Sequence, residues 1–219
     1  MGRGIYTLFQ QQILSLEFYI IMGHNSNISD KVILTDCDGV LVDWLYGFKQ
    51  FMADKGYTEQ NTTGYDIHTR YGFVSKDKSK ATAAEFNNSA AIAYLTPHLD
   101  AVKYIKKLHE EYGYVLRVIT SLSLNKYAYK ARLQNLHNLF GENVIDELIC
   151  LDTGADKTEA LEPYRDTGCI WVEDKYKNAQ LGKDMGLDSY LIDLPHNREY
   201  DFENRVSGWR DIYNRIIGE

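Results

Sequence analysis

Residues 31–43 read Lys31-Val-Ile-Leu-Thr-Asp36-Cys-Asp38-Gly39-Val-Leu-Val-Asp43, a short apolar run that ends in two aspartates and a glycine. A run of this length bounded by a turn signal predicts a buried strand of a parallel sheet. Ligands of open α/β sheets bind outside the carboxyl ends of such strands, which is where Asp36 and Asp38 would lie. Two carboxylates this close repel each other and are tolerated best around a cation, for which Mg²⁺ is the natural candidate. Taken alone, the same residues also fit a solvated turn after an ordinary strand.

Three further apolar runs end beside polar residues that are suited to phosphate chemistry. They are Tyr114–Ile119 before Thr120 and Ser121, Glu147–Leu151 before Asp156-Lys157-Thr158, and Cys169–Val172 before Glu173 and Asp174. Helical patterns separate these runs, such as the apolar spacing from Leu99 to Leu108 that closes at Gly113. Strands that alternate with helices predict an α/β fold with a parallel sheet covered on both faces.

The order acid pair, hydroxyl, lysine, acid pair resembles the haloacid dehalogenase-like (HAD) phosphohydrolase superfamily, across about residues 31–194. Matching all of its motifs in order is far more specific than matching any one of them. The resemblance implies a Rossmann-like three-layer parallel sheet, at 30–42 and 96–219, with a small helical cap inserted after the first strand, at 43–95. It also implies magnesium-dependent hydrolysis of phosphomonoesters.

A narrower likeness is to the 5′(3′)-deoxyribonucleotidases. It is carried by Asp36–Asp43, Ile119-Thr-Ser121, Lys126-Tyr-Ala-Tyr, Leu139-Phe-Gly141, Asp156-Lys-Thr158 and Val206–Ile212. This likeness implies (deoxy)nucleoside monophosphates as substrates. The chain departs from that family in having Glu173-Asp174 rather than two aspartates and a longer helix after Lys126. Another small phosphorylated metabolite, a polynucleotide 3′ phosphate, and an inactive HAD-fold binding protein therefore stay open as alternatives.

The superfamily resemblance implies a role for each motif residue. Asp36 would be the nucleophile that forms an aspartyl-phosphate, and Asp38 the general acid and then the general base. The residues that would bind phosphate are Thr120, Ser121 and Lys157, with Lys126 and Lys130 as rivals for the lysine. The hydroxyls also fit a helix N-cap, and each lysine also fits a solvated surface charge.

The same resemblance implies a magnesium site. Its ligands would be the carboxylates of Asp36 and Asp174 and the backbone carbonyl of Asp38, with Glu173 binding directly or through water. A metal there would reduce the repulsion between an anionic nucleophile and an anionic phosphate, which is the main obstacle to attack.

The region that would form the cap is rich in aromatic residues. A helix is expected over about 43–55, irregular structure over 56–78, and a second helix over about 79–94. Most of the aromatic side chains are expected to form the cap's own core, because aromatic stripes usually pack together. Those retained as substrate-pocket candidates, able to stack on a base, are Trp44, Phe48, Tyr65 and Phe73.

Composition narrows the choice of partners. A net charge of −7 over 219 residues argues against a broad basic surface, so a stable nucleic-acid complex is not expected. Residues 5–22 are partly apolar but are interrupted by Gln10-Gln-Gln12 and Glu17, so neither a membrane span nor a secretion signal is expected. We interpret 1–29 as an N-terminal extension, with Met22 as a candidate start. A cytoplasmic protein with a small phosphorylated substrate is expected, and a homodimer is left open.

Overall fold

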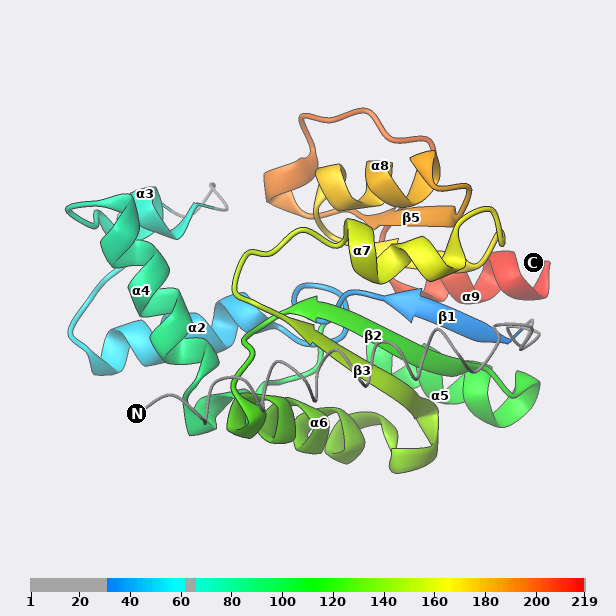
Figure 1. Ribbon diagram of the computed structural model, residues 1–219, viewed down its shortest axis with the longest axis horizontal. Coiled ribbons are helices and arrows are strands. Elements are labelled where there is room, and N and C mark those ends of the chain that lie inside the picture. Colours follow the sequence, from blue (N-terminus) through cyan, green and yellow to red (C-terminus); the bar gives the residue numbers. More distant parts are fainter. Residues whose placement is uncertain (1–30, 62–65, 219) are drawn as a thin grey trace, which may run out of the picture. The chain divides into compact units, whose positions relative to one another are not determined.

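The computed structural model describes residues 31–61 and 66–218. The expectations for 1–29 and for Tyr65 lie outside these ranges. The sheet has six parallel strands in the order β3-β2-β1-β4-β5-β6 (Figure 1). The strands are β1 (Val32–Thr35), β2 (Val115–Ser121), β3 (Ile145–Leu151), β4 (Ile170–Glu173), β5 (Asp188–Ile192) and β6 (Arg205–Val206). The predicted α/β fold class is confirmed.

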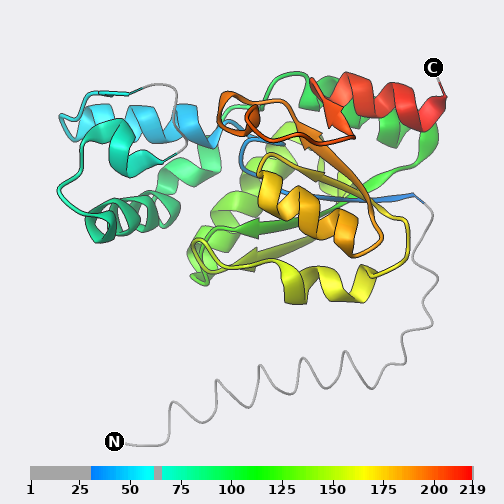
Figure 2. The same ribbon diagram turned by 90° about the horizontal axis from the view of Figure 1, so that it is seen from above.

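The helices cover both faces of this sheet (Figures 1 and 2). One face carries α5 (Ala101–Tyr112), α6 (Lys126–Phe140) and α9 (Trp209–Ile217), and the other carries α7 (Thr158–Leu161) and α8 (Tyr176–Asp184). Short 3₁₀ helices are η2 (Glu142–Val144), η3 (Glu162–Tyr164) and η4 (Pro195–Asn197). The strand order reverses at β1, which pairs with β2 on one side and β4 on the other. Such a switch point leaves a crevice at the carboxyl ends of the strands.

The C-terminal helix α9 is fastened to the loop that follows β1. The side chain of Asp100 accepts hydrogen bonds from the backbone N–H groups of Trp209 and Arg210, so it caps the helix from the start of α5. The indole of Trp209 is fully buried and donates to the carbonyl of Val40 at 3.0 Å. The buried side chain of Trp209 therefore anchors the loop that carries Asp36 and Asp38.

Helices are inserted between β1 and α5. They are α2 (Trp44–Asp54), α3 (Ile67–Tyr71), α4 (Lys76–Asn87) and η1 (Ala90–Tyr94). Within 56–78, where irregular structure was expected, α3 forms because Asp66 caps its first turn and Gly72 ends it with a left-handed φ of 61°. The expected second helix starts earlier than predicted, capped by Ser75, and is split into α4 and η1. The assignment of 43–95 as a separate cap domain stays a prediction.

Candidate active site

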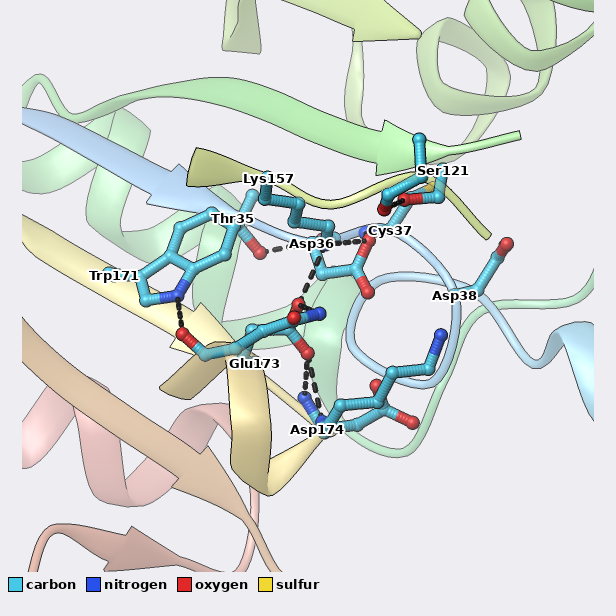
Figure 3. Close-up of polar contacts among 12 residues, drawn as sticks. Thr35, Asp36, Cys37, Asp38, Ser121, Lys157, Trp171, Glu173 and Asp174 are labelled. Carbon is cyan, nitrogen blue, oxygen red and sulfur yellow. Dashed lines mark hydrogen bonds and ion pairs between the residues drawn. The ribbon is translucent and has the colours of Figure 1, made fainter. Parts of the chain in front are cut away.

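Residues from the ends of β1 and β4 and from the loop before α7 meet at one edge of the sheet (Figure 3). The backbone N–H of Asp36 donates to the carbonyl of Val172 at 2.9 Å, which continues the β1–β4 pairing as far as Asp36. Asp36, Lys157 and Glu173 are all buried. A cluster of buried charges of this kind costs desolvation energy and is kept only where the charges compensate one another.

Lys157 is the cation of this cluster. Its ammonium nitrogen lies 2.8 Å from Oδ1 of Asp36 and 2.7 Å from Oε1 of Glu173. Burial alone would lower the pKa of Lys157, but the two carboxylates outweigh this effect and raise it, so the residue stays charged. Burial raises the pKa of Asp36, and the charge of Lys157 opposes that rise.

Glu173 has its carboxylate fully occupied by hydrogen bonds. Oε1 accepts from Lys157 and from the side-chain amide of Asn178, each at 2.7 Å. Oε2 accepts from the backbone N–H groups of Asp174 and Lys175 at 2.9 and 2.8 Å. Glu173 therefore fixes the position of Lys157 and shapes the turn into α8.

Asp174 differs from Glu173 in the hydrogen bonding of its carboxylate. Oδ1 is buried and has no hydrogen-bond partner among the described residues, while Oδ2 lies 3.3 Å from Nε2 of His196. The backbone carbonyl of Asp174 accepts from the side chains of Asn197 at 2.7 Å and His196 at 2.9 Å. A carboxylate oxygen that is buried, rigidly held and unpaired is suited to a metal ligand.

The three acids could together hold a cation. One oxygen from each of Asp36, Glu173 and Asp174 lies within 4.8 Å of the others. Hard carboxylate oxygens match the preference of Mg²⁺. Since the oxygens of Glu173 already accept four hydrogen bonds, the fit is best with Asp36 and Asp174 as carboxylate ligands and Glu173 behind them.

Gly39 is needed for this arrangement. Its φ of 77° lies in the left-handed region. A Cβ atom at this position would lie 2.6 Å from Oδ2 of Asp174, far inside van der Waals contact. The glycine therefore serves the turn after β1 and also the close approach of Asp174.

Asp38 stands apart from this cluster, with its carboxylate directed away from it (Figure 3). Its side chain is 23% exposed, and Oδ1 lies 2.6 Å from Nη1 of Arg132 on α6. Burial raises the pKa of Asp38, and Arg132 opposes the rise. Asp38 is thus within reach of solvent and is held by a different cation from the one that holds Asp36.

The hydroxyls that end β2 have different environments. Oγ1 of Thr120 is buried without a hydrogen-bond partner in the described part of the chain, whereas Oγ of Ser121 donates to the carbonyl of Ala155 at 2.9 Å. Thr120 is therefore the hydroxyl with an unused donor. The rival lysines, Lys126 and Lys130, are exposed on α6, and Nζ of Lys126 lies over the ring of Tyr127.

Comparisons with known proteins agree with this architecture. No family model matches the chain. An uncharacterized 32.4 kDa protein from the Gp30-rIII intergenic region of Enterobacteria phage T4 is 23% identical over 214 residues, which is 84% of this chain and 69% of the phage protein. The haloacid dehalogenase-like hydrolase SP0104 of Streptococcus pneumoniae superposes with a TM-score of 0.62 at 14% identity, covering 85% of this chain and 98% of that one. The chain has the HAD-like fold.

Other solved structures with this fold hold different ligands. CbbY of Rhodobacter sphaeroides, in complex with phosphate, has a TM-score of 0.55 at 16% identity and covers 83% of this chain and 96% of its own. The L-2-haloacid dehalogenase of Xanthobacter autotrophicus, with chloropropionic acid covalently bound, has a TM-score of 0.56 at 11% identity, covering 86% of this chain and 98% of its own. The HAD-like fold therefore leaves the reaction to be argued from the site.

The predicted substrate-pocket aromatic side chains that the structure describes pack between the inserted helices. Phe48 has no exposed surface and stacks on Trp44 at a ring-centroid distance of 4.7 Å. The indole N–H of Trp44, which is half-buried, donates to the side chain of Asn87 at 2.8 Å. Phe73 is buried beside Tyr71. A role in the pocket stays a prediction for all of these.

Four residues that hold the site of this HAD-like fold were not foreseen from the sequence: Arg132, Asn178, His196 and Asn197. Arg132 had a detectable signal, because it shares the buried stripe of α6 with Ala128, Leu136 and Phe140 at intervals of four residues. A charged residue on an apolar stripe calls for a buried partner. Asn178, His196 and Asn197 had no comparable signal, because only the folded chain brings them next to Glu173 and Asp174.

Among the described residues, the structure contains no helix with both the length and the apolar character that a membrane crossing requires.

Proposed function

We propose that the protein is a magnesium-dependent phosphomonoester hydrolase that works through an aspartyl-phosphate on Asp36, with (deoxy)nucleoside monophosphates as its substrates. Two observations together carry the proposal: the buried Asp36–Lys157–Glu173 charge cluster, and the buried Oδ1 of Asp174, which has no hydrogen-bond partner among the described residues. A buried lysine and a site for a divalent cation are what an anionic nucleophile needs to approach an anionic phosphate. Displacing a halide from carbon has no such need for two cations.

The atoms of Asp36 have distinguishable roles in this mechanism. Oδ1 accepts from Lys157 Nζ at 2.8 Å and from the backbone N–H of Cys37 at 2.7 Å. These contacts fix the carboxylate and leave Oδ2 as the attacking oxygen. The bond from Oδ2 to phosphorus forms as the ester P–O bond breaks, and the leaving oxygen takes a proton from Asp38. Water then attacks the phosphorus of the aspartyl-phosphate, gives its proton to Asp38, and releases inorganic phosphate and free Asp36.

The groups that bind the transferred phosphoryl would be Lys157 and Thr120, with Ser121 beside them. Oγ1 of Thr120 is buried and unpaired in the described chain, so it can donate to a phosphate oxygen. Bound Mg²⁺ would supply charge neutralisation between the phosphate and the carboxylates. The residues that would hold it are Asp36, Asp174 and the backbone carbonyl of Asp38, with Glu173 keeping the lysine in place.

Nucleoside monophosphates are supported by the motif likeness to the 5′(3′)-deoxyribonucleotidases and by the aromatic helices inserted after β1. A CbbY variant crystallised with xylulose-1,5-bisphosphate illustrates that a protein of this fold can bind a sugar phosphate. A small phosphorylated metabolite other than a nucleotide is therefore the alternative that a substrate panel must include.

Phosphate release from 5′ and 3′ nucleotides, deoxynucleotides and sugar phosphates, with and without Mg²⁺, tests the proposal. We expect turnover that requires Mg²⁺, is greatest with nucleoside monophosphates and is lost in Asp36→Asn. Asp146→Asn is the matched control, because this carboxylate lies near the start of β3, at the opposite end of the sheet from the cluster. Turnover confined to sugar phosphates would keep the reaction and overturn the nucleotide assignment. No turnover of any compound would favour a binding protein and overturn both.

A further inference from the structure

Arg132 is a fully buried cation that the proposed chemistry does not yet use. Nη1 donates to Oδ1 of Asp38 at 2.6 Å and also contacts Sγ of Cys37 at 2.7 Å. Its Nε and Nη2 atoms are buried and have no hydrogen-bond partner among the described residues. Burying a guanidinium costs several kcal/mol, about as much as a well-formed ion pair can return. An arrangement with so little stabilising return points to a role other than stability.

The position of Arg132 is fixed from more than one direction. It lies on the buried stripe of α6 and has no exposed surface. Asn135, one turn further along the same helix, donates from its side chain to the carbonyl of Leu95 at 2.9 Å, where the chain returns from the inserted helices. Burial and the anchored helix restrict the movement of the guanidinium, so it can act as a fixed donor to Asp38.

Asp38, in contrast, is the partner with freedom to move. It follows the buried Asp36-Cys37 segment, precedes Gly39, and is partly open to solvent. An aspartate on such a loop has several staggered rotamers available. The short contact with Arg132 selects one of them, and this selection is what a group that transfers a proton needs in order to meet the leaving oxygen.

We propose that Arg132 is a positioning residue for proton transfer by Asp38, because its buried guanidinium holds the Asp38 carboxylate in a single orientation from behind. The inference rests on the proposed function. Arg132 does not touch the substrate in this account, since it has no surface through which to do so. It acts on the leaving group only through Asp38.

The dependence on the leaving group separates this role from a merely structural one. A deoxynucleoside alkoxide needs a proton to leave, whereas 4-nitrophenolate leaves without one. The kcat/KM value covers binding and the transfer step and excludes breakdown of the aspartyl-phosphate. We expect Arg132→Met to lower kcat/KM for deoxyadenosine 5′-monophosphate by about 10²-fold, and for 4-nitrophenyl phosphate by less than about 10-fold.

A double-mutant cycle tests the path through Asp38. In an Asp38→Asn background, adding Arg132→Met is expected to cause no further selective loss with the nucleotide, because the group it positions has already been removed. Arg132→Lys keeps the charge and is expected to retain more of the nucleotide activity than Arg132→Met; it also serves in the cycle if the methionine variant does not fold. Arg117→Met is the matched control, since this arginine pairs with Asp146 at the far end of β2.

The outcomes distinguish the two proposals. If the unmodified protein hydrolyses neither compound, the proposed function fails. If it hydrolyses both and Arg132→Met lowers both kcat/KM values in the same proportion, the inference about Arg132 fails alone and the residue is structural. A further selective fall in kcat/KM for the nucleotide, when Arg132→Met is added to Asp38→Asn, would also overturn the inference about Arg132. Arg132 would then act by a route that does not include Asp38.

Discussion

Nζ of Lys157 lies 2.8 Å from Oδ1 of Asp36, although the two residues come from distant parts of the chain. The same nitrogen contacts Glu173 at 2.7 Å and lies 5.1 Å from the ring centroid of Trp171. The ammonium group is therefore enclosed by two carboxylates and an indole ring. Lys157 therefore joins the loop after β3 to the ends of β1 and β4.

Replacing Lys157 by methionine should therefore affect activity and stability together. We expect kcat/KM for phosphate release to fall at least about 10²-fold, because a positioned charge on the transferring phosphate is lost. The free energy of unfolding should fall by about 3–5 kcal/mol, because two buried carboxylates lose their cation. Urea unfolding gives the second value. Lys177→Met is the control, since that side chain is 83% exposed. Activity equal to that of the unmodified protein would remove Lys157 from the mechanism.

Gly39→Ala tests the close approach of Asp174. The left-handed φ of 77° alone is expected to cost about 1–2 kcal/mol with a Cβ present. Gly154→Ala carries the same penalty at a φ of 76°, but its Cβ would meet no atom within 4 Å. We therefore expect both variants to lose stability in thermal unfolding and only Gly39→Ala to lose magnesium-dependent phosphate release. Equal activity in the two variants would show that Asp174 tolerates the added methyl group.

The two acids that end β4 should respond differently to removal of charge. Asp174→Asn is expected to raise the Mg²⁺ concentration for half-maximal activity by at least about 10–100-fold, because loss of an outer-shell partner alone costs that much and here a direct ligand is weakened. Glu173→Gln should lower the free energy of unfolding and kcat, because an amide N–H₂ would face Lys157 or the backbone donors. It should raise the Mg²⁺ concentration for half-maximal activity less than Asp174→Asn does. Titration of activity with Mg²⁺ and calorimetric binding measure both effects. The reverse order would make Glu173 the direct ligand.

Phe48 separates the two interpretations of the aromatic residues in the inserted helices. Because its ring is fully buried against Trp44 and Phe86, Phe48→Leu is expected to lower the free energy of unfolding by about 1 kcal/mol and to leave KM unchanged. Steady-state kinetics with the best substrate of the panel, together with urea unfolding, provide the check. A raised KM with unchanged stability would place Phe48 in the substrate pocket.

Most of the fold could be predicted because the sequence marks where its elements end. The apolar run from Val32 to Leu34 corresponds to β1, and Gly113 ends α5 as expected. Neither β6 nor α3 was foreseen. Two residues of β6 are too few to show a periodicity, and α3 depends on the caps at Asp66 and Gly72.

The candidate site could be predicted only as far as motif residues reach. Asp36, Lys157 and Asp174 were named from the sequence, and the structure brings them to one edge of the sheet. The contact between Asp38 and Arg132 spans 94 positions in sequence and is created by the packing of α6. Likewise, no local pattern shows that Glu173 is fully hydrogen-bonded while one carboxylate oxygen of Asp174 has no hydrogen-bond partner in the described part of the chain.

Phosphorylation of Asp36 is tested most directly by trapping the aspartyl-phosphate. The protein would be mixed with a ³²P-labelled nucleoside monophosphate and Mg²⁺, quenched in acid, and digested. We predict label on the peptide that contains Asp36, released by hydroxylamine as expected of an acyl phosphate, and absent from Asp36→Asn. The contradicting result would be that the unmodified protein releases phosphate while that peptide carries no label at quench times within the first turnover. Asp36 would then not be the phosphorylated residue.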